Sequence, residues 1–91
     1  MSFDEIVTKV IKIMGLTEYH RETVETFVLD GIDNLRCSGV KDSIIYSKRC
    51  IGLLTQYTTD NWNYNPGQGR ISESFEKRVI QLTLAGDDED V

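Results

Sequence analysis

Ser43–Trp62, with the sequence SIIYSKRCIGLLTQYTTDNW, is the stretch that decides the fold. At about 100° per residue, its apolar side chains fall within half of a helical wheel and its polar side chains fill the other half. Ile45 alone lies on the polar side. Because so wide an arc is more than one neighbouring helix can cover, we expect a long central helix that contacts two or more others. The apolar arc consists of Ile44, Tyr46, Cys50, Ile51, Leu53, Leu54, Tyr57 and Trp62.

A first helix is expected at the start of the chain. Ser2 and Glu5 match the capping-box pattern S-x-x-E, in which each side chain satisfies a free backbone N–H at a helix start. Gly15 supplies a left-handed stop. The predicted core-facing stripe is Phe3, Ile6, Val7, Val10, Ile13 and Met14.

A second helix is predicted from about His20 or Arg21 to Arg36. Gly31 falls on its apolar face, where a glycine costs about 1 kcal/mol relative to alanine and so indicates close approach of another helix. A kink or break near Gly31 is the alternative. His20 is expected to be a surface residue. The apolar stripe is Val24, Phe27, Val28, Ile32 and Leu35.

The segments around the central helix are predicted as a turn, a loop and a last helix. Residues 37–42 form the turn, in which Asp42 is placed to cap the central helix. Residues 61–70 read as a flexible loop, because Asn65 precedes Pro66 and is pushed out of helical geometry. The last helix runs from about Glu73 to Leu84, capped by Ser72 or Ser74. Phe75, Val79 and Leu82 face the core, and Ile80 and Leu84 lie on the opposite side.

These elements predict an all-α fold: a small four-helix bundle around a long central third helix, with a flexible loop before the last helix. Ninety-one residues suit one small domain. We expect this domain to span residues 1–86. Residues 87–91 are expected to be a disordered acidic tail.

The net charge of −5 is concentrated at one end of the chain. Asp87–Asp90 supply four of the negative charges, so residues 1–86 carry a net charge of −1. Neither part has the basic surface that phosphate-backbone binding requires, and tight nucleic-acid binding is therefore not expected. No apolar run approaches the roughly 20 residues that cross a bilayer, and no signal peptide opens the sequence. We expect no membrane partner and a cytoplasmic origin.

The residue pattern predicts neither an enzyme nor a metal or cofactor site. Cys37 and Cys50 are expected to be reduced thiols, because Cys50 lies on the apolar arc. His20 is the only histidine and no CxxC is present, so a zinc site lacks ligands. Gly67 and Gly69 lack the preceding strand and following lysine of a phosphate loop. The residue types point instead to protein binding.

Aromatic residues gather where the central helix meets the loop. Tyr57, Trp62 and Tyr64 belong to the types enriched at protein interfaces. The other interpretation is that Tyr57 and Trp62 close one end of the core.

The order of these parts resembles the head–tail connector proteins of tailed bacteriophages, a small adaptor family often described as DNA packaging or head completion proteins. The resemblance covers about residues 3–84. It rests on a second helix ending in LRCSG at 35–39, GLLTQY at 52–57 in the central helix, Trp62, a polar Gly/Pro loop and a short final helix. It implies a subunit of a homo-oligomeric ring that docks beneath the portal protein after genome packaging. Such a subunit is made in the host cytoplasm, resides at the head–tail interface of the virion and meets a downstream head–tail joining or stopper protein.

A ring of this kind needs two different surfaces on each subunit. The candidates are Ile80 and Leu84 on one side and the region of Tyr57, Trp62, Tyr64 and Arg70 on the other. We expect the loop to become ordered when it meets the portal or a neighbouring subunit. DNA would pass through the ring without tight binding. The alternative function is a small non-enzymatic regulatory or inhibitory protein that binds one protein partner.

Overall fold

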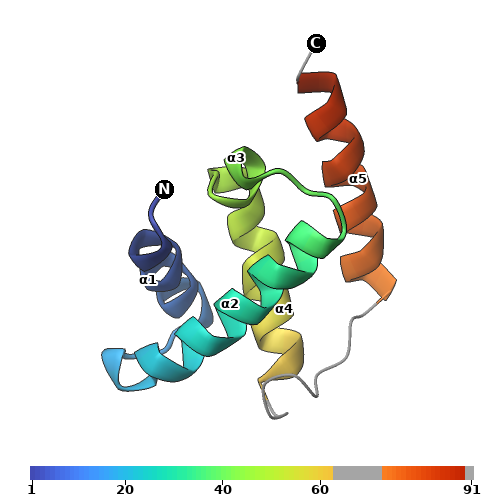
Figure 1. Cartoon of the computed structure of the whole chain (residues 1–91). Helices are drawn as coiled ribbons and strands as arrows, with labels where there is room; N and C mark the ends of the chain where they lie inside the picture. The colour runs from blue at the N-terminus through green and yellow to red at the C-terminus, as the bar shows by residue number, and fades with distance from the viewer. Residues whose placement is uncertain (63–72, 90–91) are drawn as a thin grey trace.

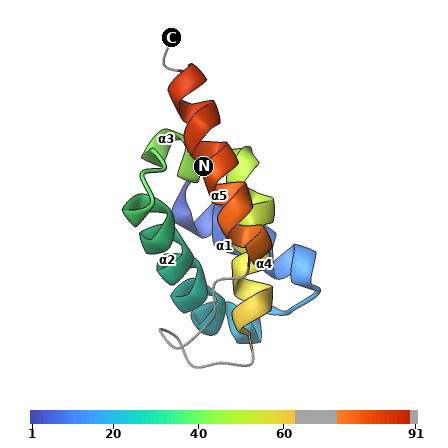
Figure 2. The same ribbon diagram turned by 90° about the vertical axis from the view of Figure 1, so that its right-hand side faces the viewer.

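The computed structural model describes the backbone of residues 1–62 and 73–89, and the side-chain environments of residues 1–62 and 75–83. The described part contains helices and no strand, which confirms the predicted all-α class (Figures 1 and 2). No helix in the described part combines the length and the apolar character needed to cross a membrane. The elements are α1 (Phe3–Met14), η1 (Glu18–His20), α2 (Arg21–Cys37), α3 (Asp42–Ile45), η2 (Lys48–Cys50), α4 (Ile51–Asn61) and α5 (Glu73–Glu89), where η denotes a 3-10 helix.

Helix α1 begins and ends as its sequence predicts. The Ser2 hydroxyl accepts a hydrogen bond from the Glu5 N–H at 3.2 Å, and Gly15 adopts a left-handed φ of 71°. The buried face is centred between Val7 and Val10. Ile13 lies at the edge of that face and is 59% exposed, so its assignment to the core was wrong, and Ile11 is buried instead.

Helix α2 is continuous, and all five residues of its predicted stripe are buried. Gly31 lies where α2 meets α4, and the side chains of Leu54 and Tyr57 are closer than ordinary van der Waals contact to the position that a Cβ would occupy. The expected close helix approach is therefore confirmed, and the alternative of a break near Gly31 is not found. In Figure 1, α2 passes diagonally in front of α4.

The central stretch is not one long helix, and this part of the prediction was wrong. It is divided into α3, η2 and α4 by a break at Tyr46 and Ser47. The Ser47 hydroxyl stabilises the break, because it donates to the Ile44 carbonyl at 2.6 Å and accepts from the Arg49 N–H at 3.3 Å. The break also reorients Ile45, which is fully buried although it did not fit a continuous helical wheel.

Asp42 does not cap this segment as predicted. It is the first residue of α3, whose N-cap is Lys41. The Asp42 carboxylate instead accepts from Arg36 Nε at 2.9 Å, and this ion pair joins the end of α2 to the start of α3. The pairing lowers the pKa of Asp42 and raises that of Arg36.

Helix α4 is the centre of the bundle, in contact with α1, α2 and α5. The prediction of a central element with several neighbours is confirmed by these contacts. Because α4 is covered on several sides, polar residues are buried with the apolar ones, and Thr55 does not lie on an exposed half as expected. Thr55, Thr58 and Asn61 each donate to the backbone carbonyl four residues earlier, which satisfies these donors inside the core.

Helix α5 begins at Glu73, where the sequence predicted it. Phe75 and Val79 are buried against the core and Leu82 is partly buried, as expected. The helix continues beyond the predicted end at Leu84 to Glu89, and so includes part of the segment expected to be a disordered tail. Its C-terminal half projects beyond the other helices (Figures 1 and 2).

The two cysteines are both free thiols. Cys37 is exposed at the end of α2, and Cys50 is fully buried in the core. The sequence-based expectation of unpaired thiols is therefore confirmed.

Candidate protein-interaction surface

Tyr57, predicted as an interface residue, belongs to the core. Its side chain is 4% exposed, and its hydroxyl donates to the Asp30 carboxylate and accepts from Asn34 Nδ2 at 3.2 Å. Burial, followed by the hydrogen bond to Asp30 and the charge of that carboxylate, raises the pKa of Tyr57 well above its usual range. Tyr57 thus joins α4 to α2 and is not accessible to a partner, which corrects its assignment.

Trp62 is partly buried at the end of α4. Its ring lies 5.8 Å from Phe27 and 5.8 Å from His20, measured between ring centroids. These contacts agree with the interpretation that Trp62 closes one end of the core. His20 is also partly buried, rather than a free surface residue, and its Nδ1 has no hydrogen-bond partner among the described residues.

Ile80 is the predicted interface residue that the structure places on the surface. Its side chain is 60% exposed on α5. Leu84 lies in the same helix, but its side chain is outside the described residues, as are Tyr64 and Arg70. Helix α5, which carries Ile80, borders two hollows that lie on different faces of the helix.

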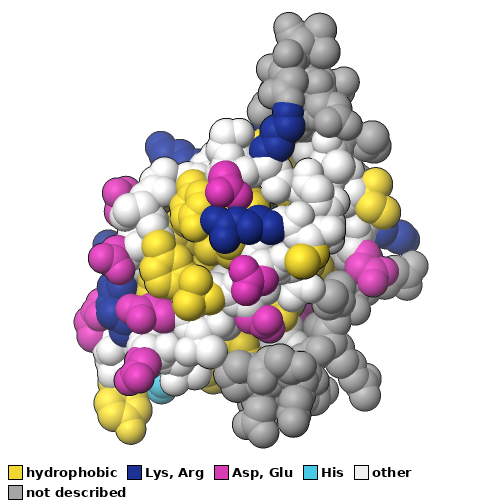
Figure 3. All heavy atoms as spheres, in the orientation of Figure 1, with side chains coloured by type: hydrophobic (Ala, Val, Ile, Leu, Met, Phe, Trp, Pro, Cys, Tyr) yellow, Lys and Arg dark blue, Asp and Glu magenta, His cyan; other side chains and the backbone are white. Residues whose placement is uncertain are grey.

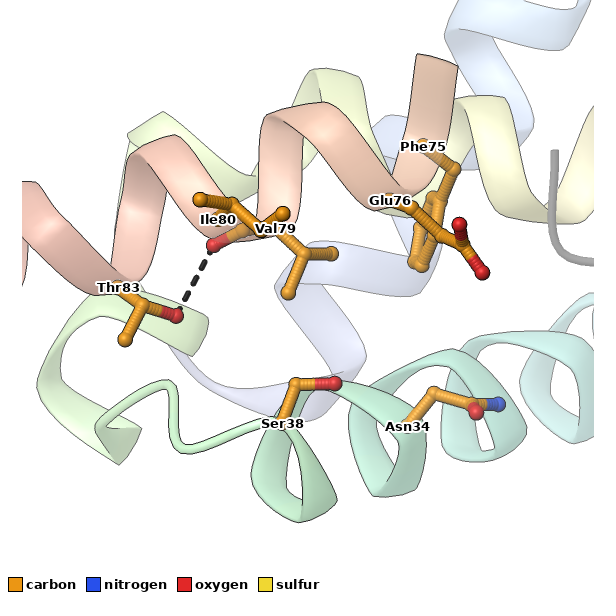
Figure 4. Close-up of a pocket in the computed structure, with 7 residues that line it drawn as sticks. All are labelled: Asn34, Ser38, Phe75, Glu76, Val79, Ile80 and Thr83. Carbon is orange, nitrogen blue, oxygen red and sulfur yellow. Dashed lines mark hydrogen bonds between the residues drawn. The ribbon is translucent and has the colours of Figure 1, made fainter. Parts of the chain in front are cut away.

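The first hollow is a groove of about 380 Å³ between α5 and the C-terminal half of α2 (Figure 4). We call it the α2–α5 groove. Its lining residues are Asn34, Ser38, Phe75, Glu76, Val79, Ile80 and Thr83.

The α2–α5 groove has an apolar side and a polar side. Phe75 and Val79 point into it from α5 in Figure 4, and the Phe75 ring packs on Tyr57 with centroids 5.3 Å apart. Asn34 of α2 and Ser38, the residue that follows α2, lie on the opposite side of the groove. The apolar surface continues outward to exposed Ile80, so a partner that covers this groove buries hydrophobic area at a helix edge.

The second hollow has a volume of about 270 Å³ and lies between α5, α4 and η2. We call it the arginine recess, because Arg49 and Arg78 approach it from different elements. The guanidinium of Arg78 donates to Gln56 Oε1, which holds it toward α4. The full lining is Arg49, Leu53, Arg78, Gln81 and Leu82.

The same two arginines affect the pKa of the Cys50 thiol. Burial raises the pKa of Cys50 to about 11, and the positive charges of Arg49 and Arg78 oppose that rise. Both charges therefore act on one small region at the start of α4. Sequence reasoning missed this recess, because the arginines lie on separate helical elements and each fits an ordinary solvated helix face.

A third hollow, of about 600 Å³, lies on the face of α1 and is lined by Asp4, Glu5, Thr8, Lys9, Lys12 and Arg21, which carry charges of both signs. In Figure 3, acidic and basic side chains are interspersed over the face formed by α1 and α2, with separate apolar patches between them. The described residues contain no group of three or more His, Cys, Asp or Glu side chains that could hold a metal ion. The two hollows beside α5 are the ones that adjoin the helix of Ile80, the predicted interface residue found on the surface.

Comparison with known protein families, with curated proteins and with solved structures found no match.

Proposed function

We propose that this chain is a structural subunit of the head–tail connector of a tailed bacteriophage. In this role it assembles with copies of itself into a ring beneath the portal, and it joins the head to the tail through a downstream joining or stopper protein. Its place in the virion is the head–tail interface. The proposal combines the family resemblance of residues 3–84 with one structural observation.

That observation is the presence of two unlike surfaces on different faces of α5. The α2–α5 groove is largely apolar and ends at exposed Ile80, whereas the arginine recess is positively charged. A head-to-tail interface joins two different patches, and it closes into a ring when the rotation between neighbours permits. A subunit with distinct patches beside one projecting helix has the surfaces that such an assembly requires.

The covered surface in the assembled ring is the face of α5 around Ile80. Burying its exposed part contributes of the order of 1–2 kcal/mol for each contact of this size. A contact that weak is compatible with a chain that stays monomeric until a template gathers several copies. The portal supplies the template in this proposal.

Co-expression with the portal protein encoded in the same genome tests the proposal. We expect a complex in which many copies of the chain form a ring on the portal, visible by electron microscopy and countable by native mass spectrometry. Absence of portal binding, together with tight one-to-one binding of a host protein, would instead support the regulatory alternative and overturn the connector proposal.

A matched pair of variants tests the role of α5. Ile80→Asp should abolish ring assembly and leave helicity by circular dichroism unchanged, because the side chain lies outside the core. Ile13→Asp is the control, since Ile13 is an isoleucine of nearly equal exposure on α1, 59% against 60% for Ile80. Assembly that survives Ile80→Asp but is lost in Ile13→Asp would move the interface to α1.

A further inference from the structure

Helix α5 is held to the bundle by a narrow row of side chains. Of residues 75–83, whose side chains the structure describes, Phe75 and Val79 are buried and Leu82 is partly buried. Positions three and four apart lie above one another on a helix, so these three side chains form a single row. Residues 76–78, 80 and 81 are exposed beside it. By contrast, seven of the 11 residues of α4 are buried. Burial therefore anchors α5 less firmly than α4.

The other helices pack together without α5. Helix α1 contacts both α2 and α4, and α2 contacts α4. Val10, Val28 and Leu54, one from each of these helices, are fully buried. In Figures 1 and 2, α5 lies along the outside of this three-helix core. Because stability varies across a structure, we expect a peripheral helix with few buried side chains to open at a lower free energy than the core.

The surface that α5 covers is a strip on one face of α4, formed by Leu53, Gln56 and Tyr57. We call it the α4 strip. The Tyr57 ring packs on Phe75 with centroids 5.3 Å apart, and the Gln56 side chain accepts a hydrogen bond from Arg78. Leu53 lines the hollow between α4 and α5. When α5 leaves, the apolar side chains of the strip lose this cover, and the surface that fits them best is another α5.

The connection to α5 is long enough to reach another copy. Glu73 follows Trp62 by 11 positions, and extended backbone spans at most about 3.3–3.6 Å per residue, or roughly 36–40 Å in all. The two shorter dimensions of the molecule are 25 and 17 Å. Covalent geometry thus allows α5 to lie on the α4 strip of an adjacent subunit. The same side chains then make the same contacts between subunits that they make within one.

We infer that α5 is a detachable helix and that the α4 strip of one copy accepts α5 of a second copy. The donor helix and the acceptor strip are different parts of each subunit, so the contact is head-to-tail and can link successive subunits of a ring. In the isolated chain, its own α5 covers the strip and keeps neighbours from using it. The inference deepens the proposed ring assembly and rests on it for the identity of that assembly.

A peptide of residues 73–89, ESFEKRVIQLTLAGDDE, tests the exchange without any ring. Carrying a fluorescent label, the peptide should bind the full-length chain weakly, because the chain's own α5 occupies the strip. The double variant Phe75→Ala with Val79→Ala weakens that internal contact, so the variant chain should bind the wild-type peptide roughly tenfold or more tightly. The same two substitutions in the peptide should abolish its binding to either chain.

Val10→Ala is the matched control for a general loss of stability. Val10 is fully buried in α1, so its truncation loosens the core without freeing the α4 strip, and peptide binding should remain weak. Circular dichroism follows the helices of each variant. In the double variant, the helical signal should fall by no more than the share of the 17 residues of α5. Unfolding of the whole chain in that variant would show that α5 is integral to the core and would overturn the inference.

Cross-linking on the portal identifies which copy donates α5. Gln56→Cys and Arg78→Cys place thiols on α4 and α5 where the wild-type side chains meet, and Cys37→Ser removes the exposed native thiol. A bis-maleimide should join the two thiols within one chain in the isolated protein. In the ring it should join successive chains, which appear as a ladder in denaturing electrophoresis. Rings that form normally but contain cross-links only within single chains would exclude the exchange and leave the connector function standing.

The peptide measurement separates the exchange from the connector function. If the wild-type peptide fails to bind the double variant, or binds the Val10→Ala variant as tightly, the exchange is wrong whatever happens on the portal. If the peptide binds as expected but the chain forms no ring on the portal, the detachable helix is supported and the connector function is overturned.

Discussion

Gly31 of α2 lies directly against Tyr57 of α4, and a Cβ at Gly31 would lie 3.1 Å from Tyr57 Cδ1. The same atom would be 3.2 Å from Leu54 Cδ2. Tyr57 has little freedom to move aside, because its hydroxyl is hydrogen-bonded to Asp30 and Asn34. The glycine therefore sets the spacing of the two helices at the centre of the bundle.

We expect Gly31→Ala to destabilise the protein by about 1 kcal/mol. Alanine improves helix propensity by about 1 kcal/mol, but overpacking against two buried side chains costs 1–3 kcal/mol and outweighs that gain. Urea denaturation followed by circular dichroism measures the difference. A stabilised variant would show that α2 and α4 separate easily.

Gly52→Ala is the matched control on α4. A Cβ at Gly52 would lie 3.1 Å from Arg78 Nη2, which is the far end of a flexible, exposed side chain. Because that side chain can move without disturbing the core, we expect Gly52→Ala to be neutral or stabilising by up to about 0.5 kcal/mol. Equal losses in the two variants would contradict the special role of Gly31.

Alkaline pH should destabilise the fold through two buried groups whose pKa values are raised. For Cys50, with a folded pKa of about 11 against 9.0 for the free thiol, stability is constant below pH 9 and falls as the pH rises toward 11. For Tyr57 the same loss begins above its ordinary pKa of 10.0, because the unfolded chain releases the proton first. Each proton contributes a slope of up to about 1.4 kcal/mol per pH unit.

Tyr57→Phe separates the two contributions. It should cost about 1–2 kcal/mol at neutral pH, because the hydrogen bonds to Asp30 and Asn34 are lost. Above pH 10 the variant should lose stability less steeply than the wild type. Urea midpoints measured from pH 7 to 11 provide the comparison, and parallel curves for the two proteins would argue against titration of Tyr57.

The sequence predicted those features that depend on one helix at a time. The Ser2 cap, the Gly15 stop and the start of α5 at Glu73 are local signals, and each was found where expected. The break at Ser47 was missed, because a helical wheel assumes a regular rotation through all 20 positions of the quoted stretch. The misfit of Ile45 was the one trace of the break visible in the sequence.

The candidate site was predicted only in part, because it depends on which helices become neighbours. Exposed Ile80 follows from the periodicity of a single helix. The burial of Tyr57 does not, since it depends on Asp30 and Asn34 of another helix. The arginine recess likewise is lined by both Arg49 and Arg78, which is 29 positions later in the sequence, and spacing alone does not indicate that the two line one hollow.

Ser47→Ala tests the break between α3 and α4. The substitution removes the hydrogen bonds to the Ile44 carbonyl and from the Arg49 N–H, and we expect a loss of about 1 kcal/mol in the free energy of unfolding. Ser43→Ala is the control, because Ser43 is exposed within α3. An unchanged Ser47→Ala variant would indicate that core packing alone fixes the break.

Thiol reactivity should distinguish the two cysteines. Cys37 is exposed and should react with a disulfide reagent at the rate of a free thiol in solution. Cys50 is fully buried, and its pKa is raised. Burial keeps the reagent away from the Cys50 sulfur, and the raised pKa lowers the fraction of thiolate, which is the species that attacks. Cys50 should therefore react only when the core opens. We expect the native protein to release one equivalent of chromophore rapidly, and a second equivalent only as urea unfolds the chain. Cys37→Ser should abolish the rapid phase alone; a rapid phase that persists in this variant would mean that the interior around Cys50 opens readily under native conditions.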